Sequence, residues 1–204
     1  MKFHRFSRST IGAIQAVTLA SVLVQMLAGC QSSPTKLYTI DAASPATRID
    51  SYAAPPLRVD SLNIPVSWDR IEVLTVSARG ELEIHDFDHW SAPLVQIARQ
   101  ALAEDLDQRL PSGSVIYPRL PKSSGALGVS VDILEFRVAG AQATMRSSWL
   151  VVPAGGMAVA KRSVASLHTE MPSTAPAAVA RAWSVLLGQL ADHIASDAAS
   201  FTSP

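Results

Sequence analysis

Leu127-Gly-Val-Ser-Val-Asp-Ile-Leu-Glu-Phe-Arg-Val138 is the stretch that decides the fold. Apolar residues occupy every second position from Leu127 to Ile133, and then the phase shifts by one, so that Leu134, Phe136 and Val138 continue the alternation. Such alternation is typical of a strand with one buried face, and a shift of one residue indicates a β-bulge. The stretch therefore predicts a long, bulged strand that is covered on one face.

Two further strands are predicted after this stretch. Residues 143–152 and 157–168 are rich in apolar and β-branched residues, and Gly155-Gly156 between them is a hairpin signal. The part of this hairpin from residue 147 to 160 contains no charged residue. Two interpretations stay open for it: a buried hairpin, or a surface for self-association or lipid passage.

Two segments have apolar residues at the four-residue spacing of an amphipathic helix. The first continues to Leu110, with Ser91 as a candidate N-cap and Pro93 in its first turn. The second spans residues 174–199, with Ser173 as a candidate N-cap. The charged residues of the first helix fall outside its apolar stripe: Arg99, Glu104, Asp107 and Arg109.

Shorter strands are predicted around the first helix. Residues 57–64 read as a strand whose phase slips near Ser61, which indicates either a bulge or burial on both faces. Residues 71–84 read as a hairpin, and residues 115–117 read as a short strand. The order is therefore strands, helix, strands, helix. This order predicts an α+β fold over residues 57–204, a single domain with a mainly antiparallel β-sheet and two amphipathic helices packed on it.

The first 29 residues have the three parts of a secretory signal peptide. Lys2, Arg5 and Arg8 give a positive start, an apolar run of about 17 residues follows, and small residues close the segment at Leu27-Ala28-Gly29. A run of that length is at the lower limit for crossing a bilayer, so an ordinary membrane anchor is the alternative. The short run followed directly by small residues favours a cleaved signal.

Leu27-Ala28-Gly29-Cys30 resembles the lipobox of bacterial lipoproteins. The resemblance implies cleavage before Cys30 and attachment of a diacylglyceryl group and an N-acyl chain such as palmitate to that cysteine. Cys30 is also the single cysteine, so no intramolecular disulfide can form. Gln31 stands where lipoproteins retained in the inner membrane commonly have Asp, which points to the periplasmic face of the outer membrane in a Gram-negative cell envelope.

Residues 30–56 are predicted to be a flexible tether behind the lipidated cysteine. The segment contains Pro34, Pro45, Pro55 and Pro56 among many Ser, Thr and Ala residues, a composition that favours extended, solvated chain. Within it, residues 36–40 could form a short strand. Fully extended, the tether could reach about 85 Å.

The charge balance excludes some partners. Removal of three basic residues with the signal, from 17 basic and 17 acidic in the full chain, leaves 14 basic against 17 acidic residues. A weakly acidic domain lacks the basic surface expected for nucleic-acid binding. No second long apolar run is present, so the lipid anchor would be the membrane attachment of the mature protein.

Few residues are of the types and spacings found in catalytic or metal-binding sites. His85-Asp86-Phe87-Asp88-His89-Trp90 contains the residue types of a catalytic or metal site, but it has no third ligand at a diagnostic spacing, and we favour a solvated connection between strand and helix. No GxSxG surrounds any serine. The sequence therefore predicts no enzyme, no cofactor and no metal. Trp90 and Trp183 are expected in the core, whereas Trp68 and Trp149 are candidates for partner contact.

Three motifs resemble those of the ABC-type transport auxiliary lipoproteins. They are Val59-Asp-Ser-Leu-Asn-Ile-Pro-Val-Ser-Trp-Asp-Arg70, Trp90-Ser-Ala-Pro-Leu94 and Tyr38-Thr-Ile40. The resemblance covers most of the mature chain, and the motifs are structural rather than catalytic. The Pro- and Ala-rich residues 42–56 depart from the family pattern.

The family resemblance implies a subunit of an intermembrane lipid transport system. The partners would be a periplasmic protein with mammalian-cell-entry (MCE) domains and, indirectly, an inner-membrane permease and ATPase. The lipoprotein would dock the MCE conduit at the outer membrane, and a homo-oligomeric ring would suit that role. The alternatives are an envelope structural or assembly lipoprotein without a transport role, and a hydrolase that uses the His85–His89 segment.

Overall fold

The computed structural model describes residues 34–77, 79–153 and 160–201. The chain divides into two compact units, residues 1–34 and 35–204. All helices and strands described below belong to the second unit.

The larger of two sheets has five strands. Its order is β5, β2, β6, β7, β8. The strands span Val115–Ile116 (β5), Leu57–Asn63 (β2), Leu127–Ala139 (β6), Gln142–Val152 (β7) and Lys161–Glu170 (β8). β6, β7 and β8 are antiparallel, whereas β2 is parallel to both of its neighbours. The predicted α+β fold is confirmed, and the sheet is mixed rather than purely antiparallel.

Both predicted bulges are present. The register between β2 and β6 shifts between Val59 and Ser61, and the register between β6 and β7 shifts between Ile133 and Glu135. As a result, Phe136 is 4% exposed while Leu134 is 47% exposed. Each bulge therefore returns the apolar side chains that follow it to the covered face, Leu62 on β2 and Phe136 and Val138 on β6, whereas Leu134 at the second bulge is exposed.

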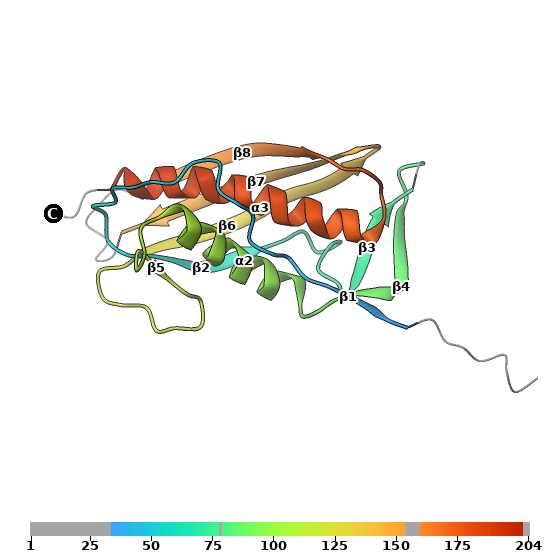
Figure 1. Ribbon diagram of the computed structural model, residues 1–204, viewed down its shortest axis with the longest axis horizontal. Coiled ribbons are helices and arrows are strands. Elements are labelled where there is room, and N and C mark those ends of the chain that lie inside the picture. The colour runs from blue at the N-terminus through green and yellow to red at the C-terminus, as the bar shows by residue number, and fades with distance from the viewer. Residues whose placement is uncertain (1–33, 78, 154–159, 202–204) are drawn as a thin grey trace, which may run out of the picture. The chain divides into compact units, whose positions relative to one another are not determined.

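Helices α2 (Leu94–Arg109) and α3 (Pro176–Ala199) cover one face of this sheet and pack against each other (Figure 1). The predicted N-caps are wrong. α2 has Pro93 and α3 has Ala175 at the N-cap position, and neither has a side-chain capping bond. The backbone of Ser91 is instead held by β1, since its N–H donates to the carbonyl of Tyr38 at 2.7 Å.

The second sheet is small and has the order β1, β4, β3. It consists of Lys36–Tyr38 (β1), Leu82–Trp90 (β4) and Glu72–Val76 (β3). The hairpin predicted for residues 71–84 is present, and its second strand continues to Trp90. The short strand predicted near residue 36 is also present, and it pairs with β4 in parallel. The small sheet lies at one end of the two helices (Figure 1).

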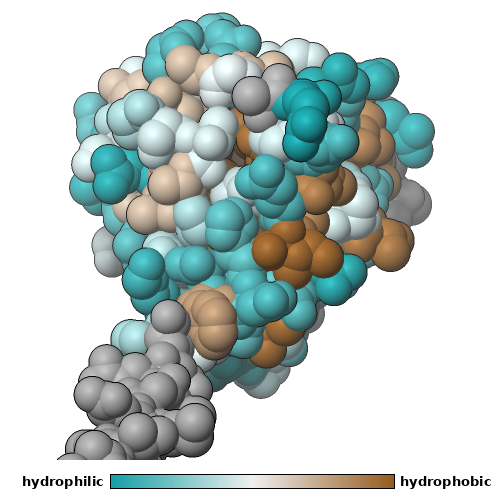
Figure 2. Space-filling view, turned by 90° about the vertical axis from the view of Figure 1, so that its right-hand side faces the viewer, coloured by the Kyte–Doolittle hydropathy of each residue, from teal (hydrophilic) through white to brown (hydrophobic). Residues whose placement is uncertain are grey.

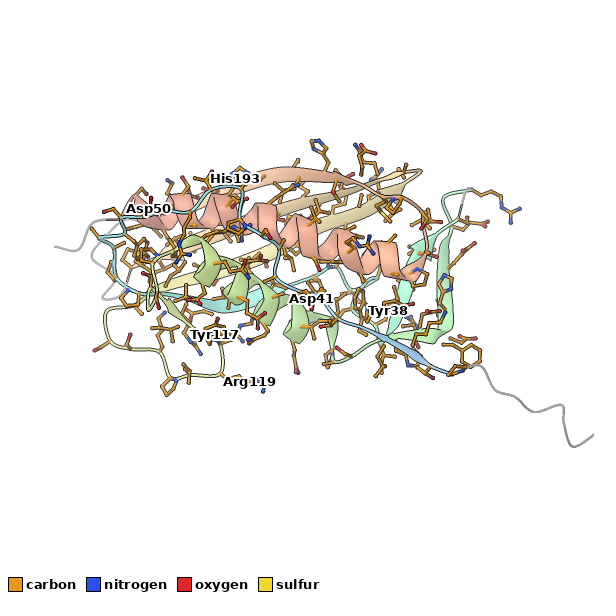
Figure 3. The ribbon with its side chains drawn as sticks, in the orientation of Figure 1. Tyr38, Asp41, Asp50, Tyr117, Arg119 and His193 are labelled. Carbon is orange, nitrogen blue, oxygen red and sulfur yellow. The ribbon has the colours of Figure 1, made fainter. Side chains whose placement is uncertain are left out.

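Most of the segment expected to be a tether lies against the domain. Residues 35–56 run from β1 along the helices to β2, and Figure 3 shows Tyr38, Asp41 and Asp50 along this path. Ile40 is 4% exposed, and the N–H of Asp41 donates to Ser184 Oγ at 3.1 Å. The Pro-rich composition indicated that this segment forms no helix. It did not reveal that the segment makes hydrophobic and polar contacts with the rest of the domain.

Among the described residues, no helix combines the length and the apolar character that a membrane crossing requires.

Candidate functional site

A buried ion-pair cluster joins the two helices to the N-terminal segment. Arg109 of α2 is 1% exposed, and its Nε donates to Asp192 Oδ1 of α3 at 2.6 Å. Its Nη1 donates to Asp105 Oδ1 at 3.2 Å and to the carbonyl of Ala43 at 3.2 Å. The N–H of Ala43 donates to the same Asp105 oxygen at 2.8 Å. The prediction that Arg109 lies on the outer face of its helix is therefore wrong.

The electrostatics of this cluster leave one negative charge in excess. Asp105 is fully buried, and burial raises the pKa of its carboxyl to about 7, against the opposing effects of the Ala43 N–H and the Arg109 guanidinium. Asp192 adds to the rise, because two carboxylates share one guanidinium. The cluster thus holds a carboxyl that gains a proton near neutral pH.

Gly188 of α3 lets the N-terminal segment approach the helices. A Cβ at this position would lie 2.7 Å from Ala43 Cβ and 3.2 Å from Arg109 Nη2. Real Cβ atoms do not come that close to a neighbouring carbon. Glycine at position 188 therefore leaves room for residue 43, and the ion-pair cluster holds the N-terminal segment against both helices.

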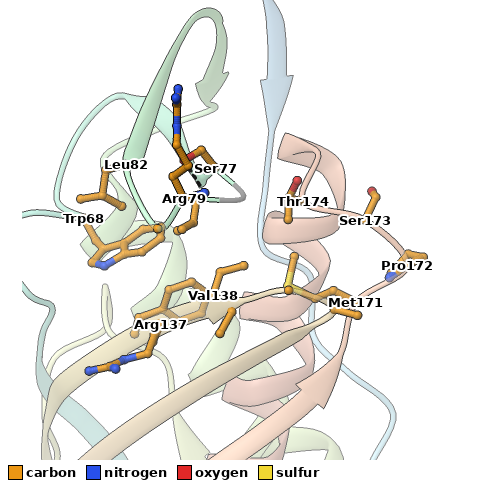
Figure 4. A pocket seen from close by; sticks show the side chains of 16 residues that line it. Trp68, Ser77, Arg79, Leu82, Arg137, Val138, Met171, Pro172, Ser173 and Thr174 are labelled. Carbon is orange, nitrogen blue, oxygen red and sulfur yellow. Dashed lines mark hydrogen bonds between the residues drawn. The ribbon is translucent and has the colours of Figure 1, made fainter.

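An open pocket of about 990 Å³ lies where three connections meet. Its walls come from the β3–β4 hairpin, the β6–β7 turn and the loop between β8 and α3 (Figure 4). In that view Trp68 and Leu82 lie on one side, Met171 and Thr174 on the other, and Val138 between them. The pocket is thus a wedge between the small sheet, the end of the large sheet and the start of α3.

The floor of the pocket is aromatic and rigid. The ring of Trp68 packs edge-on against Phe136 with centroids 4.7 Å apart, and Phe136 stacks on Trp183 of α3 at 4.3 Å. These three side chains are at most 6% exposed. Because packing on both sides fixes Phe136, the floor keeps its shape without a ligand.

Within the part of the chain that the structure describes, the charged residues of the pocket lining are two arginines, Arg79 and Arg137. Each arginine forms an exposed ion pair with an acid two residues away on the chain: Arg79 with Glu81 at 3.5 Å, and Arg137 with Glu135. Sequence patterns do not indicate these residues, because only the topology brings three distant turns together.

The small-sheet end of the domain exposes further hydrophobic residues. Figure 2 views this end and shows hydrophobic side chains beside polar ones on its surface. Leu37 of β1 is 67% exposed, and Ile84 and Phe87 of β4 are 52% and 48% exposed. Exposed apolar side chains of this size are common singly, so these three residues do not by themselves identify a site.

The two tryptophans proposed for partner contact are buried. Trp149 is 4% exposed, and its Nε1 donates to Asp197 Oδ2 at 2.9 Å. Trp68 is 6% exposed and lines the pocket as part of its aromatic floor. Their prediction as surface contacts is therefore corrected: Trp68, in the connection after β2, and Trp149, on the covered face of β7, both fill the core. Trp90 and Trp183 lie in the core, as predicted.

The His85–His89 segment forms part of β4 rather than a loop. His85 Nε2 lies 2.7 Å from Thr75 Oγ1, and the ring of His89 contacts the carbonyl of Asp86 at 2.9 Å. The hydroxyl of Tyr38 donates to Asp88 Oδ1 at 2.7 Å, which ties β1 to β4. In the part of the chain that the structure describes, no three His, Cys, Asp or Glu residues are grouped as a metal site would need. These contacts hold the small sheet together.

Several predicted residues lie outside the described part of the chain. They are the signal-peptide residues Leu27, Ala28 and Gly29, the lipidation candidate Cys30, the sorting residue Gln31, and residues 154–159 of the apolar hairpin. The described portion of that hairpin has a buried face, with Ser147, Trp149 and Val151 at most 4% exposed.

Comparisons with known proteins identify relatives of the domain. A family model for the ABC-type transport auxiliary lipoprotein component matches residues 38–195. A crystal structure of an uncharacterized protein has a TM-score of 0.65 at 16% identity, over 81% of this chain and 99% of that one. A Xanthomonas campestris protein has a TM-score of 0.57 at 16% identity, over 78% and 91%. These two structures share the fold. No curated protein matches the sequence.

Proposed function

This chain belongs to the family of ABC-type transport auxiliary lipoprotein components, and we propose that it is a non-enzymatic docking subunit of an intermembrane lipid transport system. In this proposal it receives the periplasmic conduit of an MCE-domain protein at the outer membrane. The permease and ATPase of the inner membrane are indirect partners. The observation that carries the proposal is the family match over residues 38–195, which covers the domain from β1 into α3.

The anchor is the second part of the proposal. Cys30 carries the lipid, and Gln31 favours sorting to the outer membrane. Five residues separate Cys30 from Lys36, the first residue of β1. Fully extended, the chain from Cys30 to Lys36 spans about 20 Å. A lipidated Cys30 would therefore keep the small-sheet end near the membrane, and the domain would not range over the distance that a free tether to residue 56 would allow.

A ring of copies belongs to the proposal as well. β8 is ten residues long and forms one edge of the large sheet within the described part of the chain. Edge strands can pair with a strand from another chain. Charged side chains such as Arg162 and Glu170 on β8 restrict that pairing to partners with a matching register.

Fractionation of cells tests the anchor. The Cys30→Ser variant, which lacks the thiol that accepts the diacylglyceryl group, is expected to lose labelling by radioactive palmitate. The Gln31→Asp variant is expected to keep the label but to move to the inner-membrane fraction. Palmitate labelling of the Cys30→Ser variant would contradict lipidation at this residue, and outer-membrane recovery of the Gln31→Asp variant would contradict the sorting rule.

A deletion strain separates transport from the alternative, an envelope assembly lipoprotein without a transport role. Loss of a transport subunit should change phospholipid handling at the outer membrane while other envelope complexes assemble normally. Loss of one assembled complex with unchanged phospholipid handling would support the assembly role instead. A double His85→Ala, His89→Ala variant that complements the deletion would remove the hydrolase alternative.

A further inference from the structure

Residues 41–49, which we call the strap, lie on the two helices without a fully buried residue of their own. At one end, the N–H of Asp41 donates to Ser184 Oγ of α3 at 3.1 Å. At the other end, the N–H of Ile49 donates to the carbonyl of Arg109 at 2.8 Å. Every residue of the strap is exposed or half-buried. Because segments with few buried contacts open at a much lower free energy than the core, we expect the strap to open without unfolding of the domain.

The middle of the strap lies directly against a buried carboxyl. The N–H of Ala43 donates to Asp105 Oδ1 at 2.8 Å, and its carbonyl accepts from Arg109 Nη1 at 3.2 Å. A Cβ at Gly188 would lie 2.7 Å from Ala43 Cβ and 3.5 Å from Asp105 Oδ1, so the strap, α2 and α3 meet at this carboxyl. Asp105 is fully buried, and the strap is part of its cover. Release of the strap therefore gives water access to Asp105.

The charges around Asp105 do not balance when its carboxyl is ionised. On α2 the guanidinium of Arg109 faces this carboxyl, and on α3 the carboxylate of Asp192 shares the same guanidinium. The charged residues of the strap itself, Asp41 and Arg48, are exposed. Within the described part of the chain, Asp105 Oδ2 has no hydrogen-bond partner. An ionised carboxylate with an unpartnered oxygen is costly in a buried site, so ionisation favours the state in which water reaches it.

We propose that the strap is a pH-sensitive latch, which is docked on the helices while Asp105 is protonated and is released when Asp105 ionises. With the strap docked, burial raises the pKa of Asp105 to about 7, whereas a solvated carboxyl titrates near pH 4. The docked state therefore binds the proton more tightly than the released state. Docking is strongest below about pH 4 and weakens as the pH rises through 7, by at most about tenfold per pH unit for one coupled proton.

The latch sets how firmly the domain is held to the anchored end of the chain, and this consequence alone rests on the proposed lipid at Cys30. The strap follows β1, which is the element nearest in sequence to that cysteine. When the strap is released, β1 remains attached by its three residue pairs with β4 and by the buried Ile40 that follows it. Opening of the latch thus loosens the attachment without breaking it.

Hydrogen exchange of the full-length lipidated protein in detergent micelles, measured from pH 5 to 8, tests the latch. The amides of Asp41, Ala43 and Ile49 report on the strap, because each donates a hydrogen bond to the helices in the docked state. The amide of Val131, which is 0% exposed on β6, reports on the core. Division by the intrinsic exchange rate at each pH gives a protection factor that is free of the direct effect of pH on exchange. The Cys30→Ser variant should give the same result, so a failure of the lipid anchor leaves this test intact.

The strap amides are expected to be less protected than the amide of Val131 at every pH. Their protection should fall by about fivefold between pH 6 and 7 and level off near pH 8. In Asp105→Asn, which accepts the same hydrogen bonds but does not ionise, the protection of the strap should not depend on pH. Equal protection of the strap and the core would show that the strap does not open by itself. A strap insensitive to pH in the native protein, or a pH dependence that persists in Asp105→Asn, would also overturn the latch.

Two further variants separate the role of charge from that of an ordinary contact. Asp192→Asn removes a negative charge that raises the pKa of Asp105, so it should move the loss of strap protection to lower pH. Ser184→Ala removes the acceptor of the Asp41 N–H and should lower strap protection by about fivefold at every pH, the typical effect of one hydrogen bond, without moving the midpoint. An unchanged midpoint in Asp192→Asn would show that the strap responds to lost contacts alone and would contradict the latch.

Discussion

Arg109 Nε lies 2.6 Å from Asp192 Oδ1, so a partly buried ion pair connects α2 and α3 across 83 residues of sequence. The same guanidinium contacts Asp105 one turn earlier and the backbone of residue 43. This one side chain therefore determines how both helices and the N-terminal segment meet, and that segment leads directly to the small sheet with the pocket.

Replacement of Arg109 by Met tests this role. The variant keeps the volume but leaves two carboxylates without their cation, so the free energy of unfolding should fall by about 3–5 kcal/mol. Urea denaturation followed by circular dichroism measures the change. Arg70→Met, which breaks the exposed pair with Glu72, is the control and should have little effect. An equal effect of the two substitutions would contradict a special role for the buried cluster.

Asp105 predicts an unusual dependence of stability on pH. Burial raises the pKa of its carboxyl to about 7 in the folded state, whereas the unfolded carboxyl titrates near pH 4. The folded protein binds more protons between these values, so the free energy of unfolding should fall as the pH rises from about 4 through 7. Urea midpoints across this range measure the slope.

The Asp105→Asn variant is the control for this slope and should flatten it. Asp60 and Asp197 do not disturb the test. Burial acts to raise their pKa values, but hydrogen bonds, including those from Lys122 and Ser163, lower the pKa values below the ordinary value. Their contribution is complete above about pH 4 and is lost only as the pH falls further. A slope that persists in Asp105→Asn would assign it to other groups.

Gly188→Ala should release the N-terminal segment. Alanine normally stabilises a helix interior by about 1 kcal/mol relative to glycine, but here its Cβ would lie 2.7 Å from Ala43 Cβ. Hydrogen exchange and limited proteolysis should therefore show faster exchange and cleavage between residues 41 and 56. Adding Ala43→Gly removes the opposing methyl group and should restore protection. A failure of this second substitution to rescue would show that another contact seats the segment.

Phe136→Ala should be strongly destabilising because the ring lies between Trp68 and Trp183. The expected loss in the free energy of unfolding is about 3–5 kcal/mol, from lost burial and the cavity left behind. Phe87→Ala is the matched control, since that ring is 48% exposed, and it should change stability by about 0.5 kcal/mol or less. Similar losses for both rings would argue against the aromatic floor.

The sequence predicted those parts of the fold that depend on local periodicity. The change of phase at Ser61 and at Leu134 located both bulges, because a strand with one covered face must place its apolar residues on that face. The same pattern does not encode the neighbouring strand. The parallel pairing of β2 with β6 therefore appeared only in the structure.

The candidate site was less predictable because its residues come together through topology. Arg109 was placed outside the apolar stripe by its residue type, and its partner Asp192 is on another helix. Arg79 and Arg137 stand beside turns that share no sequence signal. The pocket depends on how the two sheets are arranged. The motifs of the transport auxiliary family predict the fold as a whole but not this arrangement.

Co-purification from intact envelopes tests the docking role most directly. The full-length, lipidated protein with a C-terminal tag is crosslinked in living cells, extracted and purified, and the recovered proteins are identified by mass spectrometry, with the Cys30→Ser variant as the control. An MCE-domain protein is expected to be recovered with the lipidated protein and to be depleted with the variant. Recovery of unrelated partners without any MCE-domain protein would contradict it.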